Sequence, residues 1–165
     1  MEISRVKRLW PIIFLLTLFL VHAVPAAQKP AAAPPARAKC PVCGMFVAKY
    51  PDWCGMIVYK DATAVYFDGP KDLFTYYLNP EQYDPARKRS AIASLLVKDY
   101  YSLAFIDGRQ AYYVIGSDVN GPMGRELVPF RKKGDATEFL QDHRGKRVLH
   151  FNEISPHILK SLEQE

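Results

Sequence analysis

Residues 55–67 read GMIVYKDATAVYF. β-Branched and aromatic residues fill both ends of this segment, and the polar stretch Lys60–Thr63 separates them, which is typical of two antiparallel strands joined in a hairpin. A break follows at Asp68-Gly69-Pro70, and the apolar residues of 71–78 then recur with the spacing of an amphipathic helix. The segment therefore begins an α+β fold with a strand, a strand and a helix.

The same order of elements recurs further along the chain. Residues 92–106 carry enough valine, leucine, tyrosine and phenylalanine for one or two strands, which complete a first unit. The sequence then predicts a strand, a strand, a helix and a strand over Ala111–Ile115, Glu126–Phe130, Asp135–His143 and Lys146–Phe151, with a last short helix over Pro156–Leu162. We therefore expect an α+β fold of two homologous small ββαβ modules in tandem, at about residues 40–107 and 108–165.

The N-terminus has the pattern of an export signal. Basic residues precede an apolar run over Leu9–Ala23, and alanines follow where a signal would be cleaved. An uncleaved signal would instead be a membrane anchor, but the run is shorter than the about 20 apolar residues that cross a bilayer. We expect a cleaved signal peptide over residues 1–27 and a tether rich in proline and alanine over residues 28–39. The first cysteine is Cys40, well beyond the apolar run, so any membrane tether would come from an uncleaved signal.

The charge pattern gives no sign of a nucleic-acid partner. The formal net charge is +5, which is modest. Basic clusters at Arg87–Arg89 and Arg131–Lys133 adjoin turns and do not trace a continuous stripe for phosphates. We expect these clusters to be solvated loop charge.

The hexapeptide Cys40-Pro41-Val42-Cys43-Gly44-Met45 is the strongest candidate for a functional site. Two cysteines separated by two residues can bring both thiolates to one ion. Met45 adds a thioether beside them, and thiolate together with thioether favours a soft ion such as copper(I) over zinc. Core packing is the alternative for Met45, since methionine fills irregular gaps well.

A second methionine lies on a turn far from this motif. The segment Gly121-Pro122-Met123-Gly124 has no apolar periodicity around it, so core packing explains Met123 poorly. A thioether on such a turn suits an ion that is handed on to a partner. The predicted ligands of copper(I) are therefore Cys40, Cys43, Met45 and Met123.

The remaining cysteine and the histidines leave other sites open. The chain has three cysteines, and Cys54 could be a third thiolate, a disulfide partner or a small buried residue, of which burial is favoured. A structural zinc site would use Cys40, Cys43, Cys54 and a histidine, for which His143 is a weak candidate.

The sequence contains few motifs that are typical of enzymes. It has no Gly-x-Ser-x-Gly elbow, no phosphate-binding glycine loop and no His-Glu-x-x-His helix. A thiol-disulfide oxidoreductase using Cys40 and Cys43 is the remaining catalytic alternative. That chemistry usually places the first cysteine at a helix N-terminus directly after a strand, whereas a Pro/Ala tether precedes Cys40.

The region from Cys40 to Ile154 resembles the NosL family of nitrous oxide reductase accessory proteins. Three segments carry the resemblance in order. They are the Cys40–Met45 hexapeptide, the stretch QAYYVIGS at residues 110–117 leading to the Gly121–Gly124 turn, and RVLHFNEI at residues 147–154.

The resemblance implies a pair of homologous ββαβ modules, in agreement with the repeat found from periodicity. It implies a copper(I)-binding metallochaperone of the bacterial periplasm and cell envelope, not an enzyme. Such a protein supplies copper for nitrous oxide reductase through a membrane transporter and scaffold of the maturation machinery. By position, Met123 and the cluster of Cys40, Cys43 and Met45 are the ligands. Typical members are lipoproteins whose anchoring cysteine helps to hold copper, and no cysteine of this sequence matches it.

Overall fold

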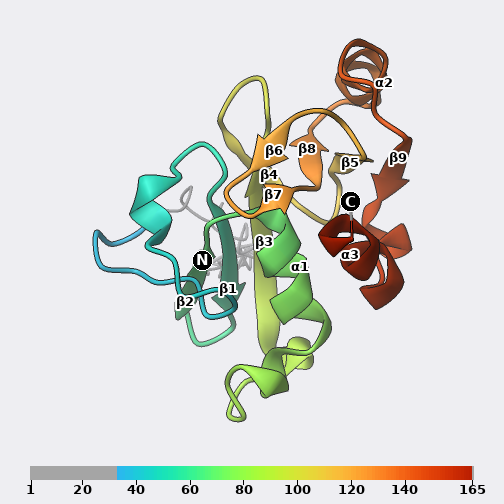
Figure 1. Cartoon of the computed structure of the whole chain (residues 1–165). Helices are drawn as coiled ribbons and strands as arrows, with labels where there is room; N and C mark the ends of the chain where they lie inside the picture. Colours follow the sequence, from blue (N-terminus) through green and yellow to red (C-terminus); the bar gives the residue numbers. More distant parts are fainter. Residues whose placement is uncertain (1–32, 165) are drawn as a thin grey trace, which may run out of the picture.

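The structure is a computed structural model that describes residues 33–164, so the predicted signal peptide and part of the predicted tether lie outside the described residues. The described chain contains a four-stranded and a three-stranded antiparallel sheet, a two-stranded hairpin and three α-helices (Figure 1). This confirms the prediction of an α+β fold. Within residues 33–164, no helix is long and apolar enough to cross a membrane.

The first sheet grows from the segment at residues 55–67. Strands β1 (Gly55–Tyr59) and β2 (Ala64–Phe67) pair antiparallel, as their sequence predicts. Strand β3 (Ile92–Lys98) pairs with the other side of β1, and β4 (Phe105–Asp107) pairs with β3, which gives the order β2-β1-β3-β4. Helix α1 (Pro70–Leu78) follows β2 and packs against β1 and β2.

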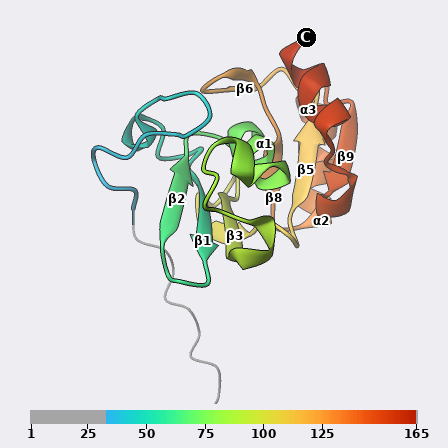
Figure 2. The ribbon, with the colours of Figure 1, turned by 90° about the horizontal axis from the view of Figure 1, so that it is seen from below.

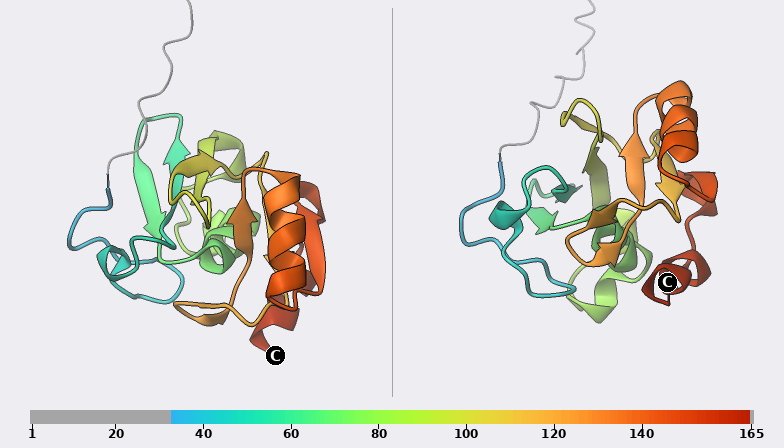
Figure 3. Two further views of the ribbon diagram at one scale, coloured as in Figure 1. Left: turned by 90° about the horizontal axis from the view of Figure 1, so that it is seen from above. Right: turned by 45° about the horizontal axis from the view of Figure 1, so that its top comes forward.

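The second sheet repeats this arrangement with shorter strands. Strand β5 (Tyr112–Ile115) lies between β8 (Val128–Phe130) and β9 (Arg147–His150). Helix α2 (Lys133–Asp142) connects β8 to β9 and lies along this sheet (Figure 3). The elements β1, β2, α1 and β3 thus follow the same order as β5, β8, α2 and β9, and the first strand of each set lies inside its sheet, while β4 and the short strands β6 and β7 are additional. The common origin of the two units and their boundaries stay predictions.

The segment before β8 differs from the sequence-based expectation. Strand β8 begins at Val128 and not at Glu126, because the Glu126 side chain turns to α1 and accepts hydrogen bonds from the N–H groups of Lys71 and Leu127. The predicted turn at residues 121–124 joins two further short strands, β6 (Asn120–Gly121) and β7 (Gly124–Arg125), in a hairpin.

Short helical segments complete the chain. Helix α3 (Pro156–Glu163) matches its prediction, begins with proline after the capping residue Ser155, and packs against α1. Single 3-10 turns occur at η1 (Val47–Lys49), η2 (Pro80–Gln82), η3 (Arg89–Ala91) and η4 (Phe151–Glu153).

A large apolar cluster joins the two units, and a second, smaller cluster lies between β5, β8 and α2. Phe74 of α1 packs edge-on against Tyr113 of β5, with ring centroids 5.1 Å apart, and lies 5.8 Å from the ring of Phe151. Leu127 and Leu149 of the second unit belong to the same buried cluster as the first sheet. Helix α1 therefore lies between β1 and β5 (Figure 2), and packing from both units fixes the position of its N-terminal turn.

Candidate metal centre

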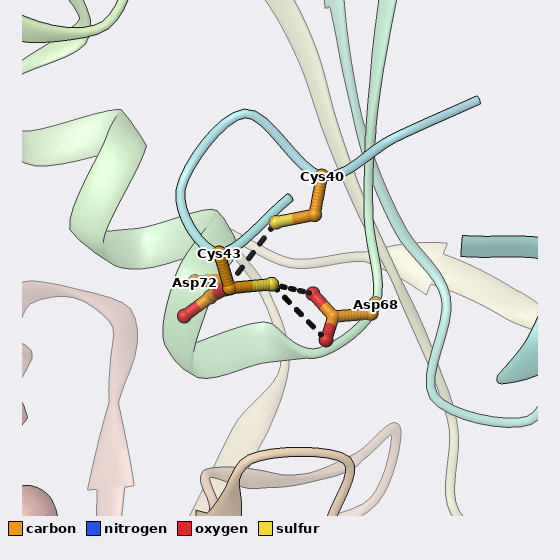
Figure 4. A group of neighbouring side chains, drawn as sticks. All are labelled: Cys40, Cys43, Asp68 and Asp72. Atoms are coloured by element: carbon orange, nitrogen blue, oxygen red, sulfur yellow. Dashed lines mark hydrogen bonds between the residues drawn. The ribbon is translucent and has the colours of Figure 1, made fainter. Parts of the chain in front are cut away.

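The Cys40–Met45 loop brings two sulfur atoms to one point. Lys39 and Phe46 form an antiparallel bridge across its base. The Cys40 N–H donates to the Met45 carbonyl oxygen, and the Gly44 N–H donates to the Cys40 carbonyl oxygen, each at 2.9 Å. Gly44 has a φ of +79°, which glycine adopts without strain. The backbone therefore reverses between the cysteines, and both thiols face the start of α1 (Figure 4).

Two aspartates lie opposite these thiols. Asp68 directly follows β2, and Asp72 lies in the first turn of α1. The Cys40 thiol donates to Asp72 Oδ2 at 3.2 Å, and Cys43 Sγ lies 3.4 Å and 3.5 Å from the two oxygens of Asp68 (Figure 4). Each of the four residues offers one ligand atom, and these atoms all lie within 4.8 Å of one another. We call Cys40, Cys43, Asp68 and Asp72 the thiol-carboxylate group.

Burial controls the protonation of this group. Cys40, Asp68 and Asp72 are buried, whereas Cys43 is half-buried. Burial raises the pKa of Cys40 far above its usual range and raises the pKa of Cys43 to about 12, and the negative charge of Asp72 adds to both effects. Burial also raises the pKa of Asp72. Without a metal, both thiols keep their protons, and an incoming cation must displace them.

The two predicted methionine ligands lie outside the thiol-carboxylate group. Met45 is half-buried, and its backbone carbonyl closes the cysteine loop. Met123 lies at the tip of the β6–β7 hairpin with 46% of its surface exposed. Its carbonyl oxygen accepts a hydrogen bond from Lys71 Nζ at 2.8 Å, and Lys71 directly precedes Asp72. The Met123 turn therefore contacts the helical turn that carries Asp72, while ligation by either thioether stays a prediction.

Cys54 and His143 also lie outside this group. The buried Cys54 thiol donates to the Gly55 carbonyl oxygen at 3.6 Å, and burial raises its pKa to about 11, in agreement with a small buried residue. His143 Nδ1 lies 3.0 Å from Asp118 Oδ1. Among the described residues, the zinc set that required Cys54 and a histidine does not assemble, and two carboxylates lie beside the cysteines instead.

A sequence model of the NosL family matches residues 31–159, which include the cysteine loop, both aspartates and both sheets. This chain belongs to the NosL family. The resemblance inferred from the Cys40–Met45 hexapeptide and the two later segments is thereby confirmed.

Two NosL proteins are similar to this NosL-family chain. The copper-binding lipoprotein NosL of Stutzerimonas stutzeri is 32% identical over 130 residues, which are 74% of this chain and 64% of that protein. This chain thus spans less than two thirds of the length of that relative. The crystal structure of the copper chaperone NosL from Shewanella denitrificans superposes with a TM-score of 0.66 at 27% identity, covering 79% of this chain and 98% of that chain. Both names describe proteins that bind copper and not enzymes, in agreement with the predicted absence of catalysis.

Sequence reasoning missed the two carboxylates of this NosL-family site. The sequence pattern places Asp68 in a strand break and assigns no role to Asp72. The available signal was the separation of the two aspartates by four residues around the predicted helix start, with Asp68 before the helix and Asp72 in its first turn, where acidic side chains are favoured. That spacing is common in helix starts, and only contact with the cysteine loop distinguishes it here.

Proposed function

We propose that this NosL-family chain is an exported copper(I) chaperone that holds the ion between Cys40 and Cys43, with Met123 and Met45 as thioether ligands. The pair of thiols in one turn, with atoms within 4.8 Å inside the thiol-carboxylate group, carries the proposal. A soft d¹⁰ ion prefers thiolate and thioether sulfur over oxygen. Both relatives are named for copper, which supports copper as the cargo.

The aspartates have a role that requires no bond between copper and oxygen. Each thiol must lose its proton when the ion binds. Each thiol already points its proton at a carboxylate, with 3.2 Å between Cys40 Sγ and Asp72 Oδ2 and 3.4 Å between Cys43 Sγ and Asp68 Oδ1. Asp68 and Asp72 are thus placed to accept the two protons on their way to solvent, so that ion uptake releases protons from the site and ion release takes them up again.

The two thiols of the site differ in their access to solvent. Cys40 is 1% exposed, whereas Cys43 is half-buried and Met123 is exposed. An incomplete ligand shell leaves room for a sulfur of the partner to attack and take the ion. We propose that the partner is a copper transporter or scaffold at the inner membrane, that the client enzyme is nitrous oxide reductase, and that transfer occurs in the periplasm. The relative's description as a lipoprotein supports a place in the cell envelope.

A structural zinc site is the second candidate, because the two carboxylates favour it. Zinc binds thiolate sulfur and carboxylate oxygen in closed tetrahedral sites. The thiol-carboxylate group offers two donors of each kind. A redox role has less support, because redox-active Cys-x-x-Cys pairs depend on a lowered thiol pKa, whereas burial raises the pKa of Cys43 to about 12.

Competition with chromogenic chelators separates the two metals. We expect the reduced protein to remain folded without metal and to hold copper(I) far more tightly than zinc. Cys40→Ala and Cys43→Ala should each abolish tight copper(I) binding, and Cys54→Ala is the matched control that should retain it. Tighter binding of zinc than of copper(I), together with unfolding on zinc removal, would refute the chaperone proposal in favour of a structural site. Met123→Ala and Met45→Leu measure the contribution of each thioether.

A further inference from the structure

Lys71 joins the start of α1 to the Met123 turn. It is only 7% exposed, although lysine is seldom buried. Its Nζ donates to the Met123 carbonyl oxygen at 2.8 Å, and its backbone N–H donates to Glu126 Oε1 at 2.5 Å. A single residue of α1 therefore binds the β6–β7 hairpin at its tip and the residue that follows β7.

Glu126 completes this connection from the second unit. It is buried, and its Oε1 also accepts from the Leu127 N–H at 2.9 Å. Helix α1 begins after Gly69, which provides no capping side chain, so Glu126 supplies the acceptor for an N–H of the first turn. A Cβ atom at Gly69 would collide with the Glu126 carboxylate and lie 3.7 Å from Pro122 Cδ. The hairpin thus lies directly on the segment between Asp68 and Asp72.

The contact links the exposed methionine to the thiol-carboxylate group. Asp72 follows Lys71 in the chain, and its Oδ2 accepts a hydrogen bond from the Cys40 thiol at 3.2 Å. The Met123 turn itself is held by two strands of two residues each. So short a hairpin has little stability of its own. Its position relative to the cysteines therefore depends on contacts from outside the hairpin, and Lys71 Nζ makes one of them at the tip.

We infer that Lys71 is a positioning residue for copper(I): it fixes the Met123 turn against the first turn of α1, so that the thioether lies beside an ion bound by Cys40 and Cys43. This inference rests on the proposed function. The competing interpretation is that Lys71 only stabilises the fold, as the partner of the buried Glu126. In that case its removal would lower stability and leave the contribution of Met123 to copper(I) binding intact.

A double-mutant cycle distinguishes these interpretations. Lys71→Leu removes the ammonium group and keeps an apolar side chain without adding a thioether, Lys71→Arg restores a donor, and Lys132→Leu removes a charge from the exposed N-cap of α2 as a control. We expect Lys71→Leu and Met123→Ala each to weaken copper(I) binding by about tenfold, and the double variant to bind no more weakly than either. Lys71→Arg and Lys132→Leu should bind like the wild type. Independent, multiplicative losses in the double variant would refute the positioning role.

The methyl resonance of Met123 gives a second measurement, because copper(I) is diamagnetic. In ¹³C-methyl-methionine NMR, this resonance should shift on copper(I) loading in the wild type and Lys71→Arg, but not in Lys71→Leu. If Lys71→Leu does not fold, Gly124→Ala decides instead, because alanine disfavours the turn at a φ of +80° without touching Lys71. Loss of the shift supports the inference, and a wild-type shift overturns it.

The outcomes also separate this inference from the proposed function. A wild-type protein that does not bind copper(I) tightly would refute both. A wild type that binds copper(I), with Met123→Ala or Lys71→Leu of unchanged affinity, would refute the positioning role and leave ion binding by Cys40 and Cys43 in place.

Discussion

Replacing Glu126 by glutamine should remove a loss of stability that develops as the pH rises. Burial raises the pKa of this carboxyl from 4.5 to about 8, against the opposing effect of the N–H groups of Leu127 and Lys71. In the unfolded chain the carboxyl has its ordinary pKa. At a pH below both values the group is protonated in both states and favours neither. As the pH rises above the lower value, the unfolded chain releases the proton and the folded chain keeps it, which favours unfolding.

The size of the effect follows from the two pKa values. Each pH unit between them lowers the free energy of unfolding by about 1.4 kcal/mol, so the loss from about pH 4.5 to about pH 8 is about 5 kcal/mol. Glutamine is neutral throughout, and its carbonyl oxygen can still accept the hydrogen bonds from Lys71 and Leu127. The advantage of Glu126→Gln over the wild type should therefore grow with pH.

Urea unfolding of the reduced, metal-free protein at several pH values measures this difference. The difference in unfolding free energy between Glu126→Gln and the wild type should rise by about 1.4 kcal/mol per pH unit across this window. Glu138→Gln makes the same chemical change on the exposed side of α2 and serves as the control. Parallel stability curves for the wild type and Glu126→Gln would refute the reasoning.

The cysteine protons, Cys54 and the shared core each lead to a further expected outcome. The apparent affinity for copper(I) should rise with pH through neutrality, because the ion displaces thiol protons from Cys40 and Cys43; a pH-independent affinity in chelator competition would contradict this. Cys54→Ala should leave that affinity unchanged while lowering the free energy of unfolding by about 1 to 2 kcal/mol, as measured in urea, since the side chain is buried outside the thiol-carboxylate group. Phe74→Ala should lower the free energy of unfolding by about 3 to 5 kcal/mol and destabilise both sheets in a single transition, because the Phe74 ring packs against Tyr113. Separate unfolding transitions by far-UV and near-UV circular dichroism would argue against a shared core.

The sequence by itself determined the order of the elements and the position of the cysteine loop. Alternation in residues 55–67 and the helical spacing of residues 71–78 are local properties, and the structure has strands and a helix there. The reversal between Cys40 and Cys43 is also local, because Gly44 permits the turn that faces both thiols the same way. For these features, neighbours in the chain provide nearly all of the information.

Only the tertiary structure decided what surrounds the two thiols. Asp72 is 32 residues from Cys40 in the chain and Asp68 is 25 residues from Cys43, and no periodicity relates them. The contact from Lys71 to Glu126 spans 55 residues. Residues so far apart in the chain meet only because α1 packs in a core made by both units. This packing places the first turn of α1 against the cysteine loop on one side and against the Met123 hairpin on the other. The sequence pattern of one segment cannot predict these contacts, because they depend on how the other segments pack.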